Sequence, residues 1–194
     1  MPILALAASI TATLAVDKDK GRFTPPTIES IETKQTGNGV TVAVVPYHTE
    51  ALASQAFGKL NPYQHGITPV LLIIRNDSKE SLSLERMQVE YIDKTRERIE
   101  ATPAGEVKYG RSPKRPSMTP SPIPGIRLGS KKNPLAAAEI EGRAFAAKML
   151  PPGESAHGFL YFQTGHRSGS HIYITGITQA STGKELFYFD VPLD

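Results

Sequence analysis

The longest run of large apolar side chains after the N-terminal region is Ile67–Ile74, which ends at a polar cluster. A run this short, bounded by turn residues, is typical of a buried strand rather than a helix. Pro69 fits this interpretation because proline is tolerated among the first residues of a strand. The side chains of Asn76-Asp-Ser78 can hydrogen-bond their own backbone. The pattern therefore predicts a core strand over 67–75 followed by a turn.

Alternating apolar and polar residues predict further strands on both sides of this run. Asn38-Gly39 is a dipeptide favoured in tight type I′ hairpin turns, and alternating valines follow it. Met87, Val89 and Tyr91 fall on one face of a half-buried strand. Besides 67–75, the predicted strands are 39–46, 87–93, 157–162, 171–179 and 185–191, with a weaker candidate at 27–35 and an exposed strand or turn at 94–100.

The last two predicted strands are joined by the turn Ser181–Lys184, so we expect them to pair antiparallel. Ile177 is out of phase with the residues before Gly176, which predicts a bulge at that glycine. The residues expected on one face of the final strand are Phe187, Phe189 and Val191.

Two stretches have the spacing of helices. In 49–60, Leu52, Ala56 and Leu60 recur every four residues and Thr49 can cap the N-terminus, which predicts a short helix on a crossover between strands. The second predicted helix, 134–149, begins after an Asn-Pro pair suited to a helix start and ends before a Pro-Pro pair.

These elements contain no repeated strand–helix unit of the kind that builds a parallel sheet. The prediction is a mainly β fold, an antiparallel β-sandwich of about seven strands with a short crossover helix and an insertion at 103–150. A chain of 194 residues fits one domain. We divide it into a signal-like apolar segment (1–16), a linker (17–27) and a single sandwich domain (28–194).

The segment 3–16 is apolar and uncharged. It is too short for a membrane-spanning helix but suits the hydrophobic part of a secretory signal, and small residues near Ala15 suit cleavage. No basic residue precedes it. The alternative is an apolar strand or helix that packs on the domain. The first interpretation predicts export to the periplasm or cell surface, without a transmembrane span.

The net charge of +3 is unevenly distributed, because 103–133 contains seven basic residues and one acidic residue. This stretch also holds six prolines, and we interpret 103–133 as an exposed loop. Its basic residues are candidates for binding a protein or envelope partner, against the alternative of a solubilising surface. With Tyr109 as the sole aromatic from 108 to 132, it offers no stacking platform for nucleic acid. The candidate binding residues are Lys108, Arg111, Lys114, Arg115, Arg127, Lys131 and Lys132.

Three histidines near one another in the sequence, His157, His166 and His171, form a weak candidate for a metal site. Their spacing matches no known ligand pattern, and a solvated loop and strand ends explain them as well. The loop 165–170 is a weaker candidate for holding an anion through Arg167. An ordinary hairpin loop explains it better.

The absence of cysteine excludes disulfides, thiolate metal sites, iron–sulfur clusters and cysteine nucleophiles. The motifs Gly-x-Ser-x-Gly and His-Glu-x-x-His are also absent. We therefore expect a protein that is not an enzyme and needs no cofactor.

Two stretches resemble exported bacterial immunoglobulin-like sandwich domains of uncharacterised function. One is Gly66–Ser78, an apolar strand that ends in Asn-x-Ser, and the other is Leu150–Phe162, a Pro-Gly turn that leads into an aromatic strand. The resemblance implies strands on facing sheets with a shared core, and an exported location. It implies no activity.

The sequence as a whole predicts a non-enzymatic, exported interaction or structural module of the bacterial envelope. The alternative is a periplasmic accessory protein that binds a small ligand or a metal through 157–171. The sequence does not predict an oligomeric state.

Overall fold

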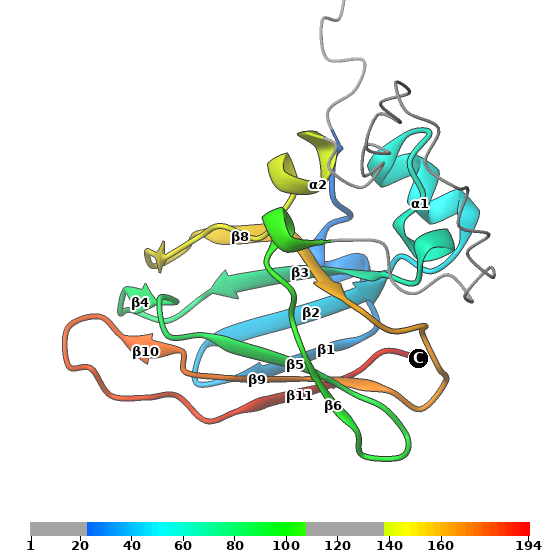
Figure 1. Cartoon of the computed structure of the whole chain (residues 1–194). Coiled ribbons are helices and arrows are strands. Elements are labelled where there is room, and N and C mark those ends of the chain that lie inside the picture. The colour runs from blue at the N-terminus through cyan, green and yellow to red at the C-terminus, as the bar shows by residue number, and fades with distance from the viewer. Residues whose placement is uncertain (1–22, 108–137) are drawn as a thin grey trace, which may run out of the picture.

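The structure is a computed structural model of the chain, and it describes residues 23–107 and 138–194 (Figure 1). The predicted apolar segment 1–16 and the seven basic candidates between 108 and 132 therefore lie outside the described residues. In the described part, the strands are β1 (Lys34–Gly37), β2 (Val40–Pro46), β3 (Thr68–Asn76), β4 (Leu82–Ser83), β5 (Gln88–Ile92), β6 (Arg98–Glu100), β7 (Met149–Leu150), β8 (Ser155–Phe162), β9 (His171–Thr175), β10 (Thr178–Gln179) and β11 (Phe189–Pro192). The helices are α1 (Glu50–Phe57) and α2 (Ala138–Gly142), with short 3₁₀ turns at Ile28–Ser30, Pro62–His65 and Ala104–Glu106.

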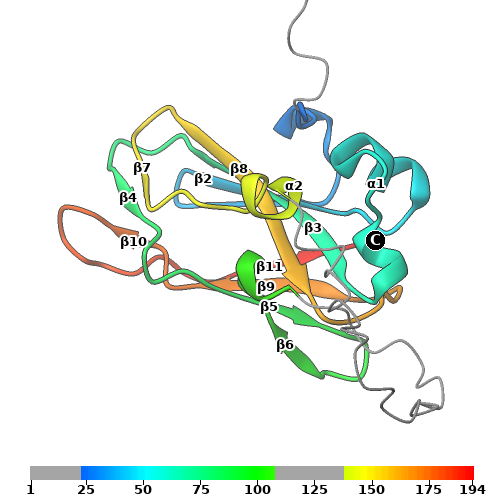
Figure 2. The same cartoon turned by 45° about the horizontal axis from the view of Figure 1, so that its top comes forward.

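The strands form antiparallel sheets, as predicted. The first sheet has the order β1-β2-β3-β8 and the second the order β11-β9-β5-β6. A small third sheet, β10-β4-β7, lies at one end of the molecule (Figure 2). The first and second sheets share one hydrophobic core, so the molecule is a mainly β sandwich.

The first sheet is covered on both faces, which explains why β3 has no polar alternation. Val70, Leu72 and Ile74 belong to the core shared with the second sheet. Leu71 and Ile73 belong to a separate core that also contains Phe57 of α1 and Ile140 of α2. Figure 1 shows the helices on one side of this sheet and the second sheet on the other. The run Ile67–Ile74 therefore forms the middle of three layers.

The hairpin between β1 and β2 confirms the turn predicted from Asn38-Gly39. Both residues have positive φ, 52° and 73°, as a type I′ turn requires. Gly37 pairs with Val40 across the turn.

Helix α1 confirms the predicted helix start, because the Thr49 hydroxyl accepts a hydrogen bond from the Leu52 N–H. The helix ends at Phe57 and is capped by Gly58, earlier than the predicted end at residue 60. It joins β2 to β3, which are antiparallel neighbours. The helix therefore covers one end of a hairpin and does not cross between sheets.

The predicted helix 134–149 is wrong beyond Gly142, and residues 134–137 lie outside the described part. After α2 the chain runs beside β8, where the Phe145 N–H donates to the Phe159 carbonyl at 3.0 Å. This close approach depends on Gly158, because a Cβ there would lie 2.4 Å from the Phe145 Cα. The local helical preference of the alanines is overridden by these contacts.

The resemblance to exported sandwich domains implied that the two motif strands lie on facing sheets. This implication is wrong, because β3 and β8 are direct neighbours from Thr68 opposite Phe162 to Arg75 opposite Ser155. Both strands face the same two cores.

The C-terminal third differs from its prediction at three points, the first being that the final strand, β11, begins at Phe189 and not at residue 185. The chain leaves the second sheet at Gly176, and β10 pairs with β4 in the small sheet, so the expected bulge is a change of sheet. Phe189 and Val191 are buried as predicted, but Phe187 is 78% exposed. Leu186 packs on the core in its place, and its N–H donates to the Ile177 carbonyl at 2.8 Å.

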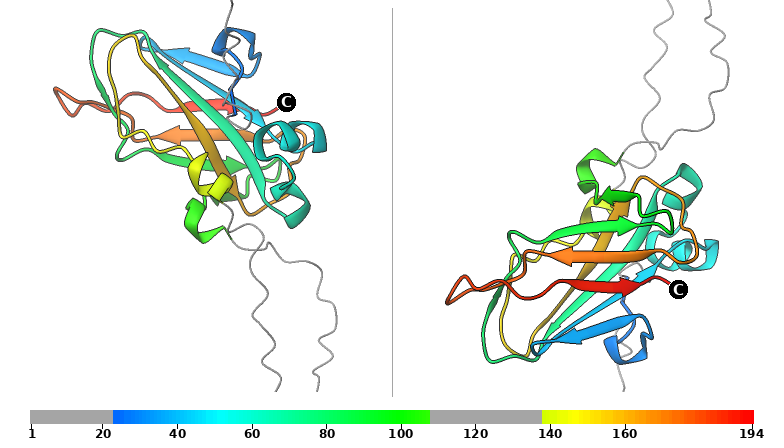
Figure 3. Two further views of the ribbon diagram at one scale, coloured as in Figure 1. Left: turned by 90° about the horizontal axis from the view of Figure 1, so that it is seen from above. Right: turned by 90° about the horizontal axis from the view of Figure 1, so that it is seen from below.

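The sandwich is closed along one side and more open along the other. On the closed side β1 lies beside β11, and the Asp190 N–H donates to the Gln35 side chain at 2.7 Å (Figure 3). On the other side, β8 and β6 are the outer strands of their sheets. The chain crosses between them at Thr102, whose N–H donates to the Tyr161 carbonyl at 2.7 Å.

Candidate functional site

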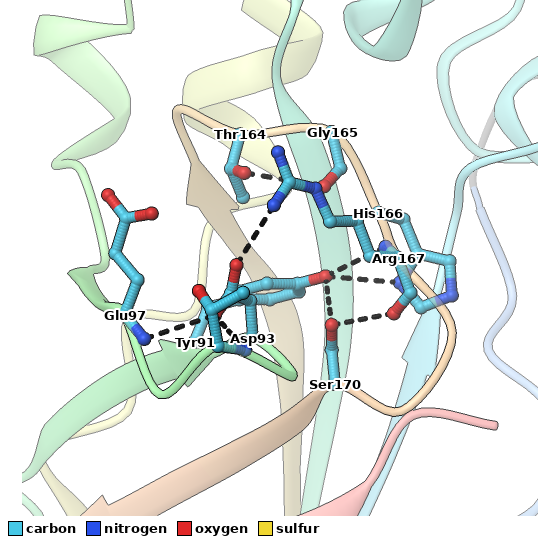
Figure 4. A network of polar contacts seen from close by, with 9 residues as sticks. Tyr91, Asp93, Glu97, Thr164, Gly165, His166, Arg167 and Ser170 are labelled. Atoms are coloured by element: carbon cyan, nitrogen blue, oxygen red, sulfur yellow. Dashed lines mark hydrogen bonds and ion pairs between the residues drawn. The ribbon is translucent and has the colours of Figure 1, made fainter.

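A network of polar contacts attaches the loop 163–170 to β5 (Figure 4). The fully buried Tyr91 donates its hydroxyl to the Ser170 Oγ at 2.7 Å and accepts from the Arg167 N–H at 3.0 Å. The Ser170 hydroxyl in turn donates to the Arg167 carbonyl at 2.6 Å. Because the hydroxyls of Tyr91 and Ser170 are used in these bonds, their arrangement indicates a structural clamp rather than a nucleophile with its base.

Asp93 is part of the same network. One of its carboxylate oxygens accepts from Thr95 and from the Glu97 N–H, and the other pairs with Arg167 at 3.0 Å. The hydrogen bond from the Thr95 side chain is the largest influence that lowers the pKa of Asp93, with smaller contributions from backbone N–H groups and Arg167. The candidate anion-binding side chain, Arg167, is thus engaged with an internal carboxylate.

The structure brings His166 next to His48, which lies far away in the sequence. The centroids of their rings are 4.5 Å apart. The His166 side chain is 9% exposed, and its Nε2 lies 3.8 Å from a carboxylate oxygen of Asp194. Burial, and secondarily the neighbouring His48, lowers the pKa of His166. His48 Nδ1 lies 3.2 Å from the Pro46 carbonyl, which can only accept, so this nitrogen carries the proton.

The three histidines of the candidate metal site have separate surroundings. His157 lies on β8 opposite Ile73, and the His171 Nδ1 contacts a carboxylate oxygen of Asp190. The described residues contain no group of three or more His, Asp or Glu side chains arranged to hold a metal ion. The pair that does form, His48 with His166, has no signal in sequence spacing because the fold alone brings its members together.

A groove of about 570 Å³ lies on the more open side of the sandwich. It is bounded by β5 and the segment 84–87 before it, by the end of β6, and by the segment 145–148, with β8 below. Its lining residues are Leu84, Glu85, Met87, Gln88, Val89, Glu90, Glu100, Ala101, Phe145, Ala146, Ala147, Lys148 and Leu160.

The groove combines an apolar surface with carboxylates. Its apolar lining residues include Met87, Ala101, Phe145, Ala147 and Leu160, which also pack against the shared core. Surfaces of this kind, apolar with a few polar groups, are typical of ligand and peptide sites.

Two of the carboxylates lie directly opposite each other, because Glu90 of β5 pairs with Glu100 of β6. Like charges in this position repel each other. Arg98 forms an ion pair with Glu90 at 2.7 Å. Within the described residues Glu85 and Glu100 have no ion pair, and Lys148 is the one basic side chain that lines the groove. The groove therefore has an excess of negative charge.

One wall of the groove offers backbone groups. The Lys148 carbonyl accepts from the Leu84 N–H at 2.8 Å, and Phe145 is bonded to β8. Between them, the backbones of Ala146 and Ala147 have no hydrogen-bond partner in the described part of the chain. No sequence pattern indicates this wall, because its alanines lie in the stretch with a predicted helix.

Comparisons with known proteins add little to this geometry. No model of a protein family matches the chain, and no curated protein matches it. One similar solved structure is a presumed lipoprotein (ycdA) from Bacillus subtilis strain 168, 12% identical with a TM-score of 0.37, matched over 82% of this chain and 38% of that one. Another is the yjhA protein from Bacillus subtilis, 10% identical with a TM-score of 0.40, matched over 84% of this chain and 98% of that one. At this level neither likeness supports an inference about function.

The match spans 38% of the length of the first of these proteins. Among the helices in the described residues, none has the length and apolar character needed to cross a membrane.

Proposed function

We propose that the chain is an exported, non-enzymatic interaction module of the bacterial envelope, with an immunoglobulin-like sandwich that binds a protein partner in the groove beside β5. The groove is the observation that carries the proposal. It combines an apolar surface, unpaired carboxylates and unpaired backbone groups in one place. A protein segment can use all three of these features at once.

The chemistry around the groove supports binding rather than catalysis. A nucleophile needs a base within hydrogen-bond reach and a third group that orients the base. Among the described residues, the groove lining contains no Ser, Thr, Tyr or His. In the described residues, the polar side chains around Tyr91 and Asp93 bond to neighbouring groups of the fold instead of facing an open site.

Export and fold class enter the proposal from the sequence. The apolar segment 3–16 supports export. The immunoglobulin-like class comes from the sequence resemblance of the segments around β3 and β8, although these strands are neighbours in one sheet. The basic residues between 108 and 132 stay candidates for a second contact with a partner or with anionic headgroups.

A photo-reactive amino acid placed at single positions in the full chain tests the binding site. Position 147 lines the groove, whereas position 51 lies on the exposed face of α1. We expect irradiation of cells that naturally make the protein to give a discrete cross-linked species from position 147 and none from position 51. Equal cross-linking from both positions, or none from position 147, would contradict the proposed binding site.

A further inference from the structure

Resting on the proposed function, we infer the chemistry of the partner: an extended peptide segment in which Lys or Arg alternates with small apolar residues. Such a segment would lie along the groove between Ala146–Ala147 and the end of β5. Three independent features of the groove lead to this assignment: its charge, its unpaired backbone and its apolar lining.

The charge comes from Glu85, Glu90 and Glu100. Because Glu90 and Glu100 face each other across β5 and β6, one cation placed near both would relieve their mutual repulsion. Arg98 already contacts Glu90, but no ion pair in the described residues reaches Glu100 or Glu85. Lysine and arginine side chains of a partner are the protein groups that meet this requirement.

The unpaired backbone comes from Ala146 and Ala147. Ala147 is half-buried and Ala146 is exposed, and neither backbone has a hydrogen-bond partner in the described residues, so both are free to pair with another chain. An extended peptide supplies matching donors and acceptors along its length, as in the addition of a strand to a sheet.

The apolar lining fits the alternating side chains of such a peptide. In an extended chain successive side chains point to opposite sides. When one set points toward Met87, Ala101 and Leu160, the other set points away from that surface and can reach the exposed carboxylates of Glu85 and Glu100. The small side chains at 146 and 147 leave room for the peptide backbone to approach. An acidic segment does not meet the charge condition, and a strongly helical segment does not meet the backbone condition.

The test measures binding of two labelled peptides to the full chain by fluorescence anisotropy at low salt. One peptide alternates Lys and Val over about eight residues, and its counterpart has Glu in place of each Lys. We expect the Lys peptide to bind and the Glu peptide not to bind. The double variant Glu85→Gln, Glu100→Gln should weaken binding about tenfold, since it removes two charges and keeps the shape of the side chains. The matched control Glu32→Gln, Glu154→Gln removes two exposed carboxylates outside the groove lining and should leave affinity unchanged.

Three results would overturn this inference. The first is equal binding of the two peptides, and the second is an affinity unaffected by loss of Glu85 and Glu100. The third is that the Lys peptide binds neither the native chain nor a variant with Lys114, Arg115, Lys131 and Lys132 replaced by Ser. Binding to this variant alone would assign the groove to the chain's own basic segment and also overturn the assignment to a partner. A groove cross-link from position 147 together with any of these results would leave the proposed function standing and reject the partner chemistry.

Discussion

The side-chain amide of Asn76 donates to the Leu150 carbonyl at 3.0 Å, which joins the end of β3 to a strand that lies 74 positions later in the chain. The same amide group also donates to the Glu80 carbonyl at 2.8 Å, and its oxygen accepts from the Ser78 N–H and hydroxyl. Asn76 is fully buried. One side chain thus forms the turn after β3 and also fixes β7, which leads into β8.

Replacement of Asn76 by Ala should therefore lower the free energy of unfolding by about 3 kcal/mol, because several buried groups lose their partners. Asp77→Ala is the matched control. Asp77 forms a partly exposed ion pair with Arg75, and such pairs contribute at most about 1 kcal/mol. Urea unfolding followed by circular dichroism measures both values. Similar losses in the two variants would show that the buried amide has no special role.

A methyl group at position 158 should damage the groove from below. Gly158→Ala places a Cβ 2.4 Å from the Phe145 Cα, so the segment 143–147 must move away from β8. We expect a loss of about 3 kcal/mol in the free energy of unfolding, together with weaker binding in the groove. Gly165→Ala provides the comparison, because no atom lies within 4 Å of an added Cβ there. A native-like stability for Gly158→Ala would mean that the segment does not pack on β8 as described.

The histidine pair should make stability depend on pH. The pKa of His166 is lowered in the folded chain by burial and by His48, so the unfolded chain takes up a proton first as the pH falls. This contribution to stability is complete above about pH 6.5, the ordinary value for histidine, and is lost as the pH falls toward the lower folded value. The groups that face His166 are His48, Tyr91 and Asp194, and Asp194 opposes the shift.

The corresponding measurement compares unfolding free energies at about pH 7.5 and about pH 5 for the native chain and for His166→Gln. The native chain should lose more stability on acidification than the variant loses. His157→Gln, which changes an exposed histidine of β8, should behave like the native chain. The same pH dependence in all three proteins would remove the histidine pair from the account.

Export can be measured separately from binding. Residues 1–27 fused to a phosphatase that is active only outside the cytoplasm should give enzyme activity in bacteria, because the apolar segment directs secretion. Ile10→Arg interrupts that segment and should abolish most of the activity, whereas Lys18→Arg lies after it and should not. Full activity in the Ile10→Arg fusion would contradict a secretory role for the segment.

The sequence predicted the sandwich well where one local signal dominated. The apolar run of β3, the Asn38-Gly39 turn and the Thr49 cap each depend on residues close together in the chain, and all three are confirmed. The predictions were wrong where distant contacts override local preference. Residues 143–149 have helical composition but run beside β8 through Gly158, and Phe187 follows a strand pattern but yields its core position to Leu186.

The candidate site was harder to predict for the same reason. His48 and His166, and likewise Glu85 and Glu100, have no sequence spacing that links them, and the fold alone brings each pair to one place. The groove wall at 146–147 was hidden by the helix prediction. Sequence alternation did place Glu90 on the outer face of β5, but the opposing Glu100 followed only from the register of β6.

The central claim is that the groove beside β5 is where the chain binds its partner. The most direct measurement is the dissociation constant of the partner identified by cross-linking, determined for the native chain, for Ala147→Trp and for Ala51→Trp. The indole at 147 fills the groove, whereas the same change at 51 adds equal bulk on the exposed face of α1. We predict at least a tenfold loss of affinity for Ala147→Trp, about 1.4 kcal/mol, and native affinity for Ala51→Trp. Equal affinities for all three proteins, with each variant folded, would contradict the claim.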